Sequence, residues 1–272
     1  MILLWSKAIN SHNPWEPNYN GCFYATTDDV LFLYEDWNDL CALPRSKDTA
    51  DVIYSSSSES CLELPYSWIM VDEADTSYLF FAQDRAIDLS IMTVTNDLPN
   101  PVLSKYRAKI KPQAYYEESP FYFGEYCISH KGMSGYICTK NGNPIWEFKG
   151  QAYLYTDIQR WNNCVYFGTA GKGGYVYILD IDTGEALAKI KTGGTSSIVR
   201  FKNLCYFLGN NKKATLFCVD LTNGNIVQEI ALPGKATTYS RVQLIDNHIH
   251  VITFEYKGNT LKNAVWSCIV LE

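Results

Sequence analysis

The stretch Asn163–Gly194, NCVYFGTAGKGGYVYILDIDTGEALAKIKTGG, repeats itself at Leu204–Gly234, LCYFLGNNKKATLFCVDLTNGNIVQEIALPG. The turn glycines of the two copies, Gly184 and Gly224, lie forty positions apart. A repeat of about 40 residues filled with short strand-like runs is typical of a β-propeller, in which each repeat is one small antiparallel sheet, or blade. The sequence therefore predicts an all-β fold, a β-propeller that occupies residues 1–272 as a single domain.

Strand-like runs of one kind also occur before and after these two repeats, at comparable places along the chain. The six runs are VLFLYE from Val30, SYLFFA from Ser77, FYFGEYCI from Phe121, CVYFGT from Cys164, LCYFLG from Leu204 and HIHVITF from His248. They predict six four-stranded blades. The irregular stretch from Ala42 to Pro65 leaves a seventh blade open.

The two ends of the chain complement each other. The last repeat stops at its third strand, Asn263–Glu272 (NAVWSCIVLE), and the first residues, Ile2–Ile9 (ILLWSKAI), precede the first complete repeat. We expect the N-terminal strand to join the C-terminal blade and close the ring, because closure removes an exposed sheet edge.

Hairpin turns can be followed through the earlier repeats. Lys140–Gly150 (KNGNPIWEFKG) places Gly142 where Gly184 stands one repeat later, and Asp88–Ile110 predicts another pair of strands around a turn at Asn96 to Pro101. The glycines supply the positive φ that such turns require. In the two clear repeats, we expect Asp182 and Asn223 to bond the backbone ahead of them.

The repeat YVYILDIDTGEALAKI resembles the blade motif of the pyrroloquinoline-quinone-like (PQQ-like) propellers, in which a strand ends in Leu-Asp-x-x-Thr-Gly. The match is good at Leu179–Gly184, fair at Val219–Gly224 and weak or absent before residue 130, so it covers about a third of the chain. The resemblance implies the fold and a tight turn that packs neighbouring blades. The quinone-dependent enzymes of that superfamily are exported and often carry adjacent cysteines, which this sequence lacks, so the resemblance implies a non-catalytic binding scaffold.

Composition predicts a soluble cytoplasmic protein. The chain is 47% hydrophobic and 19% charged, which is ordinary for a globular protein. Its N-terminus lacks the features of a signal peptide, and no apolar run is long enough to span a membrane. The nine cysteines contain no CxxC pair, so we expect reduced thiols packed in the core.

No motif predicts an enzyme, a metal site or a cofactor. There is no GxSxG nucleophile elbow, and the chain has four histidines. His248 and His250 share one face of a strand and Cys268 is expected on its neighbour, but their spacing is not that of zinc sites, so packing is the preferred interpretation. His12 and His130 stand in polar, loop-like sequence and are expected to be solvated.

The charges are unevenly distributed. Residues 1–135 hold 19 Asp and Glu against 9 Lys and Arg, and residues 136–272 hold 10 against 14. One side of the propeller is therefore expected to carry a negative field, which disfavours nucleic-acid binding. The field either keeps the protein soluble or forms a docking face for a basic partner, with aromatic anchors beside the carboxylates. The residues predicted for that face are Trp15, Asp28, Asp29, Glu35, Asp36, Trp37, Asp39, Asp72, Glu73 and Asp75.

The leading hypothesis is a non-catalytic propeller that binds another protein, in its more specific form an immunity or antitoxin protein that neutralises a basic toxin domain. The alternative is an enzyme or a binder of small carbohydrate-type molecules that uses the central channel. Convergent His, Glu or Arg side chains at the channel mouth, or a bound metal, would favour that alternative.

Overall fold

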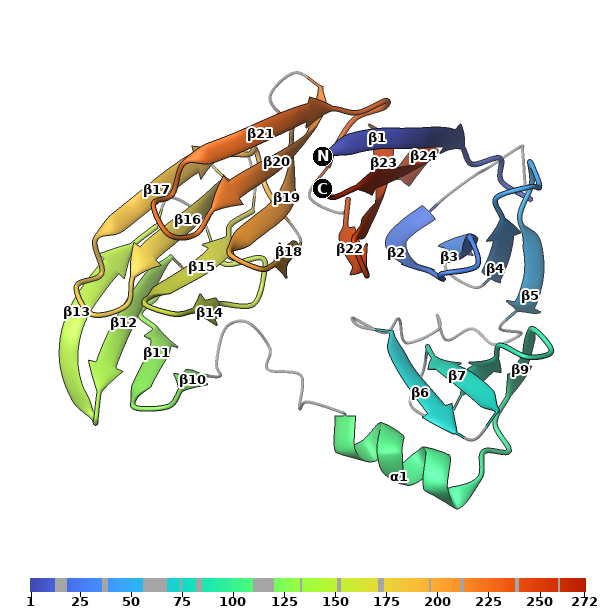
Figure 1. Ribbon diagram of the computed structural model, residues 1–272, viewed down its shortest axis with the longest axis horizontal. Helices are drawn as coiled ribbons and strands as arrows, with labels where there is room; N and C mark the ends of the chain where they lie inside the picture. Colours follow the sequence, from blue (N-terminus) through green and yellow to red (C-terminus); the bar gives the residue numbers. More distant parts are fainter. Residues whose placement is uncertain are drawn as a thin grey trace. The chain divides into compact units, whose positions relative to one another are not determined.

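The protein folds as a β-propeller of six four-stranded antiparallel blades, as the repeat predicted (Figure 1). The computed structural model describes residues 1–12, 19–35, 39–55, 68–73, 75–81, 85–109, 120–132, 134–150, 153–170, 174–195, 197–210, 213–237, 240–258 and 260–272. Part of the stretch from Ala42 to Pro65 belongs to the first blade, and the rest lies outside these residues. By its internal contacts, the chain divides into two compact units.

Unit 1 comprises Met1–Ala8, Ala114–Lys257 and Asn263–Glu272, and it contains four blades. Three of them are continuous in sequence, and each runs through four strands in order. Their strands are β10 (Phe121–Phe123), β11 (Tyr126–His130), β12 (Gly135–Lys140) and β13 (Asn143–Lys149); β14 (Gln159–Trp161), β15 (Cys164–Gly168), β16 (Tyr175–Asp180) and β17 (Ala186–Lys191); and β18 (Ile198–Phe201), β19 (Leu204–Asn210), β20 (Ala214–Asp220) and β21 (Ile226–Ala231).

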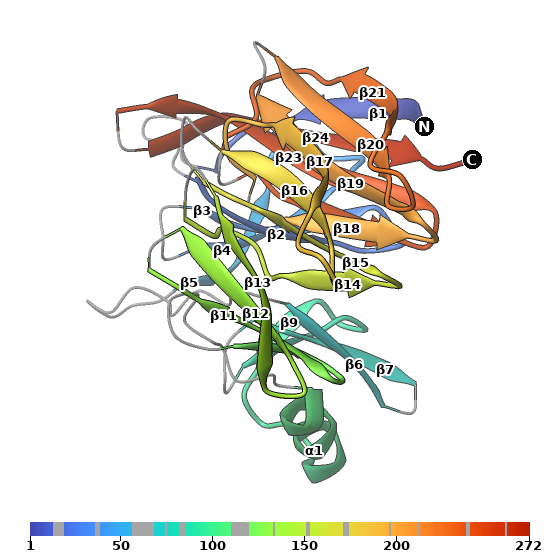
Figure 2. The ribbon, with the colours of Figure 1, turned by 90° about the vertical axis from the view of Figure 1, so that its left-hand side faces the viewer.

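The fourth blade of unit 1 is built from both ends of the chain, which confirms the predicted closure. β22 (Val242–Ile245), β23 (His248–Lys257) and β24 (Thr260–Val270) supply three strands, and β1 (Ile2–Ala8) pairs antiparallel with β24 from Ile2 opposite Val270 to Ala8 opposite Val265. The two termini accordingly lie close together in both ribbon views (Figures 1 and 2). The ring of Trp5 meets Trp266 edge to face at 4.8 Å between centroids.

The inner strands of unit 1 are buried on both faces because each blade packs between neighbours. Every residue of β15 is buried, and so are the four central residues of β16. Side chains of these strands interdigitate with those of the next blade, where Phe207 stacks on Phe217 at 5.5 Å. These strands therefore read as continuous apolar runs in the sequence, in contrast to the alternating pattern of β17.

The tight turns of the two clear repeats follow the predicted glycines but use a different aspartate in one repeat. Gly184 and Gly224 have φ of 74° and 73°. In the first repeat, Asp180 accepts the backbone N–H groups of residues 182 and 183 at 2.9 Å, so the prediction that named Asp182 was wrong. Asp180 ends β16, which puts its carboxylate beside the N–H groups of the turn, in the geometry of an Asx turn. Asn223 accepts from the N–H of Asn225, as expected.

Unit 2 comprises Ile9–Gln113 and Gly258–Lys262, and it contains two blades and the helix α1 (Asn100–Lys109). The strands are β2 (Tyr19–Ala25), β3 (Val30–Glu35), β4 (Asp39–Pro44) and β5 (Asp51–Ser55) in the first blade, and β6 (Ile69–Glu73), β7 (Thr76–Phe80), β8 (Ala86–Asp88) and β9 (Thr93–Thr95) in the second. Their shared core is rich in aromatic residues and contains Phe32, Tyr34 and Phe81.

Helix α1 corrects the prediction of a strand pair around Asn96 to Pro101. The second blade instead turns between β8 and β9, and the chain becomes helical from Asn100. Pro101 suits the first turn of a helix, and Val102 and Tyr106, four residues apart, are both buried. Tyr106 stacks on Phe80 at 3.8 Å between centroids, which docks the helix on the second blade. No helix in the described ranges is long and apolar enough to cross a membrane.

No disulfide bond joins the cysteines that the structure describes. All seven lie in strands, and six of them are buried. This confirms for these residues the prediction of reduced core cysteines.

Candidate functional site

Two of the predicted acidic residues occupy the turn between β2 and β3. Asp28 is exposed, and Asp29 takes a positive φ of 57°, which Asp tolerates better than most residues. The carboxylate of Asp29 pairs with the guanidinium of Arg45 at 3.0 Å. This end of the first blade therefore presents carboxylates to solvent, with one Arg beside them.

Three more acidic residues lie at the hairpin between β6 and β7 of the second blade. Asp72 and Asp75 are exposed, and Asp72 accepts a hydrogen bond from Ser77 at 2.6 Å. Glu73 is partly buried and pairs with Lys105 of α1. The hairpin is thus acidic at its tip, and a basic side chain from the helix balances part of the charge.

Glu35 corrects the prediction of an acidic docking face. Its side chain is fully buried at the end of β3, so it cannot be a surface contact. Its Oε2 accepts from Ser11 Oγ at 2.5 Å and from the backbone N–H of His12 at 3.1 Å. Burial raises the pKa of this carboxyl, and the bonds from Ser11 and His12 oppose that rise.

His12 is likewise not the solvated side chain that its polar sequence predicted. Its imidazole is 24% exposed and lies between two carboxylates, with Nδ1 at 2.5 Å from Glu35 Oε2 and Nε2 at 3.0 Å from Asp39 Oδ2. Asp39 also accepts from Ser55 Oγ at 2.6 Å. The sequence missed this group because Ser11 and His12 reach Glu35 from more than twenty positions away. Trp15, Asp36 and Trp37, predicted for the same face, lie outside the described residues.

The negative charge is concentrated in the two blades of unit 2. Residues 19–98 hold 15 Asp and Glu against 3 Lys and Arg. Of the predicted residues that the structure describes there, Asp28, Asp72 and Asp75 are the exposed ones. Asp29, Asp39 and Glu73 each have a positively charged or titratable partner. The candidate site is therefore an acidic surface on both blades of unit 2.

The histidine and cysteine group on β23 and β24 forms a packing contact. His250 is buried, its Nδ1 accepts from Trp266 Nε1 at 3.2 Å, and its Nε2 lies 4.0 Å from Cys268 Sγ. The expected placement of Cys268 beside His250 is confirmed. Among the described residues, the group of His, Cys and acidic side chains with metal-ligand spacing is a different one, His12, Glu35 and Cys41.

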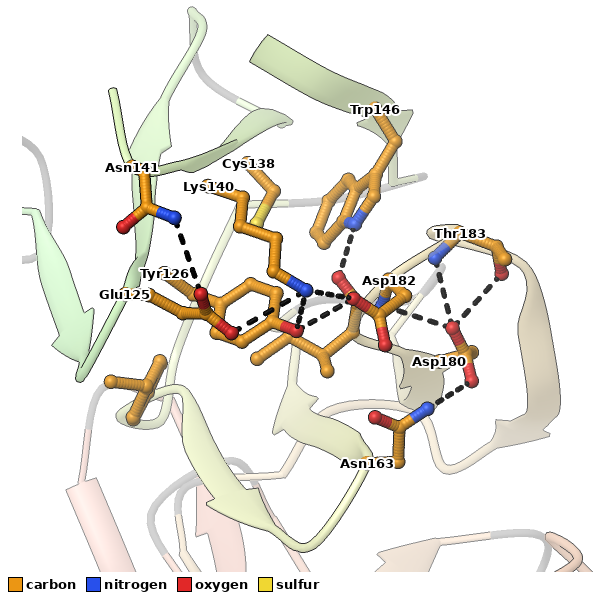
Figure 3. Close-up of polar contacts among 12 residues, drawn as sticks. Glu125, Tyr126, Cys138, Lys140, Asn141, Trp146, Asn163, Asp180, Asp182 and Thr183 are labelled. Atoms are coloured by element: carbon orange, nitrogen blue, oxygen red, sulfur yellow. Dashed lines mark hydrogen bonds and ion pairs between the residues drawn. The ribbon is translucent and has the colours of Figure 1, made fainter. Parts of the chain in front are cut away.

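A second polar cluster, in unit 1, fastens one blade to the next (Figure 3). Asp182, in the turn after β16, accepts from Tyr126 OH at 2.6 Å and from Lys140 Nζ at 2.9 Å. Lys140 also donates to Tyr126 OH at 2.7 Å. Trp146 on β13 donates from Nε1 to the carbonyl of Ile181 at 2.7 Å. Asp182 therefore connects two blades through Tyr126 and Lys140. No sequence motif had indicated a role for these two residues.

The hydrogen bonds within this cluster lower the pKa of its carboxyl group and raise the pKa values of its phenol and its amine. The bonds from Tyr126 and Lys140 hold the pKa of Asp182 below its usual value. The bond to Asp182 raises the pKa of Tyr126, and its bonds to Tyr126 and Asp182 raise that of Lys140. Each group thus keeps its ordinary charge near neutral pH, which is typical of a structural contact.

Comparisons with known proteins give structural likeness at low sequence identity. No protein family and no curated protein matches the sequence. The chain is similar to the crystal structure of BamB from Moraxella catarrhalis, with 13% identity and a TM-score of 0.44 over 92% of this chain and 82% of that one. It is also similar to the AfRom2 CNH domain, with 9% identity and a TM-score of 0.44 over 94% and 96%. The computationally designed Ika8 protein shares 12% identity, with a TM-score of 0.42 over 91% and 70%. The β-propeller fold thus rests on the chain's own sheets and strand pairings.

Proposed function

We propose that this protein is a non-catalytic scaffold that binds a basic protein through the acidic surface of unit 2. The observation that carries the proposal is the charge of residues 19–98, where 15 acidic residues stand against 3 basic ones. The exposed carboxylates of Asp28, Asp72 and Asp75 lie at hairpin turns, where a partner can reach them.

An excess of one charge acts first on the encounter between two proteins. A negative field attracts a basic partner and raises the association rate, and it repels acidic partners and nucleic acid. Charges at the edge of an interface affect affinity less than groups buried at its centre. The acidic surface therefore supports selection and rapid capture of the partner.

The specific form of this proposal is an immunity or antitoxin protein whose partner is a basic toxin domain. Such a partner needs its positive surface for its own contacts, so covering that surface would inactivate it. The proposal also places the scaffold among the PQQ-like propellers. It is supported by the Leu-Asp-x-x-Thr-Gly turn at Leu179–Gly184 and by Trp146, which packs on that turn.

The proposal can be tested by capturing partners from the cells in which the protein occurs, with the full chain as bait. Three baits are compared: the native chain, a variant with Asp28→Asn, Asp72→Asn and Asp75→Asn, and a control with Glu185→Gln, Glu229→Gln and Asp246→Asn. All six positions are exposed, and each variant removes three charges. The control changes lie in unit 1.

We expect a protein with a basic domain to be retained by the native chain and the control and to be lost from the unit 2 variant. Exposed substitutions of this kind usually alter stability by no more than about 0.5 kcal/mol, so all three baits stay folded. Failure to capture any basic protein, or equal capture by all three baits, would contradict the proposal.

A further inference from the structure

The first blade of unit 2 gathers three different metal-binding side chains at one point. Glu35 ends β3 and stands opposite Asp39, the first residue of β4, while Cys41 follows two positions later. Side chains two apart on a strand share a face, so Asp39 and Cys41 lie on the face that Glu35 occupies. His12 completes the group from the segment after β1, which a parallel bridge between Asn10 and Thr49 ties to unit 2.

The ligand atoms of this group are already close together. The His12 Nδ1 lies 3.7 Å from Cys41 Sγ and 2.5 Å from Glu35 Oε2, and all three candidate ligand atoms lie within 4.8 Å of one another. Tetrahedral zinc with bonds of about 2.0 to 2.3 Å separates neighbouring nitrogen and sulfur ligands by about 3.5 Å. The nitrogen and sulfur are therefore spaced for a shared ion without rearrangement of the strands.

Glu35 supplies an independent indication of a ligand site. Its Oε2 is occupied by Ser11 and by the backbone of His12, but its Oε1 is fully buried and has no hydrogen-bond partner among the described residues. A buried carboxylate oxygen without a partner is costly, and proteins usually pair such a group or let it coordinate a metal. An ion bound through Oε1 leaves the existing bonds of Oε2 to Ser11 and the backbone in place.

Asp39 stands on the far side of the imidazole from Glu35 and Cys41. Its Oδ2 lies 3.0 Å from His12 Nε2, and its Oδ1 accepts a hydrogen bond from Ser55 Oγ at 2.6 Å. A proton kept on Nε2 leaves the lone pair of Nδ1 directed toward Cys41 and Glu35. Carboxylates commonly orient metal-binding histidines in this way from the side remote from the ion.

A cysteine nucleophile activated by His12 and Asp39 is the competing interpretation of the same side chains. Such a nucleophile must reach its substrate, and Cys41 is completely buried. A single ion, by contrast, can enter beside His12, whose side chain is 24% exposed. Burial therefore favours a metal over catalysis.

We propose that His12, Glu35 and Cys41 bind a divalent transition metal ion of the zinc class, with Asp39 orienting His12. A thiolate, an imidazole and a carboxylate together suit zinc or cobalt, whereas magnesium and calcium prefer oxygen ligands alone. The metal-bound form needs the lone pair of His12 Nδ1 and the thiolate of Cys41, so binding releases the protons of these two atoms to solvent. The ion then ties the segment before β2 to the first blade.

The test is a titration of the metal-free full chain with Co²⁺ alone near neutral pH, followed by visible absorption and by metal analysis after gel filtration. We expect one tightly bound ion with the spectrum of tetrahedral cobalt and a thiolate charge-transfer band. Cys41→Ala and His12→Gln should abolish this spectrum. Asp39→Asn should weaken binding by about 10- to 100-fold, as expected for a residue that orients a ligand.

The matched control is Cys268→Ala, because Cys268 is another buried cysteine beside a histidine. This variant should bind cobalt like the native chain. The proposal is overturned if the folded native chain binds no stoichiometric cobalt, if His12→Gln binds it unchanged, or if Cys268→Ala loses it. Should Cys41→Ala not fold, His12→Gln decides, because His12 is partly exposed and the change is conservative in size.

Discussion

The blades of unit 1 and those of unit 2 use polar residues in different ways. In unit 1, Asp180 and Asp220 each bond the turn that follows their strand, and Asp182 joins two blades. In unit 2, Asp28, Asp72 and Asp75 are exposed at hairpin turns, and Glu35 is buried with one free oxygen. The blades with the regular repeat thus use these carboxylates to fix turns and join blades, whereas the blades that depart from the repeat contain the carboxylates on which our two binding proposals rest.

Removal of β1 should have the largest effect on stability, because it takes one strand from the fourth blade of unit 1. The deletion tests whether unit 1 depends on a strand from the other end of the chain. Without Met1–Ala8, β24 loses the partner that pairs with it from Val265 to Val270, and an open sheet edge results. We expect an aggregating or unfolded chain, measured as soluble yield and as loss of a cooperative melting transition.

A pair of point variants sharpens this expectation. Leu3 packs against the core of the last two blades, whereas its neighbour Leu4 is 50% exposed. Leu3→Asp should therefore destabilise the protein strongly and Leu4→Asp should not. Equal melting temperatures for the two variants would show that β1 contributes little to unit 1.

The inter-blade turn of unit 1 can be tested with matched glycines. Gly184 and Gly142 both have positive φ, but an added Cβ at Gly184 would lie 2.6 Å from Trp146 Cγ, whereas at Gly142 it meets nothing within 4 Å. Both Gly→Ala variants incur about 1 to 2 kcal/mol for the left-handed backbone. The crowding against Trp146 should cost Gly184→Ala about 1 to 3 kcal/mol more. Urea denaturation measures the difference, and equal free energies of unfolding would argue against tight packing of the turn.

A smaller effect is expected from the pH dependence of the Asp182 contact. Its pKa is lowered in the folded protein, so the stabilisation is complete above the ordinary Asp value of 3.8 and is lost as the pH falls through the lower folded value. Asp182→Asn should remove this dependence. The melting temperatures of native chain and variant should therefore differ most above that pH and converge in stronger acid. Glu185→Gln, in the same turn, serves as the control, and a gap that widens in acid would contradict the assignment.

The parts of the fold that the sequence predicted are those specified by local chemistry. Gly184 and Gly224 mark turns whose positive φ other residues avoid, and the apolar runs between them have the length of strands. The helix was missed, although Pro101 and the spacing of Val102 and Tyr106 are helical signals, because they follow directly on two short strands.

The candidate sites were harder to predict because they depend on contacts between distant segments. Glu35 ends an apolar strand, and nothing near it in sequence shows that Ser11 and His12 cover it. The one local signal was the spacing of Asp39 and Cys41, which stand two positions apart on the strand that follows Glu35. This spacing indicates that the three side chains lie on one face of the sheet. For the acidic surface, the sequence provided the charges, while the structure separates the exposed Asp28 and Asp75 from the buried Glu35.

The central claim, that unit 2 receives a basic partner, is tested most directly by the association rate constant of the captured partner at several ionic strengths. We expect the native chain and the unit 1 control (Glu185→Gln, Glu229→Gln, Asp246→Asn) to associate rapidly, with rates that fall steeply as salt is added. The unit 2 variant (Asp28→Asn, Asp72→Asn, Asp75→Asn) should associate more slowly and with a flatter salt dependence. If the control instead shows the slower rate and the unit 2 variant matches the native chain, the partner binds unit 1 and the account is wrong.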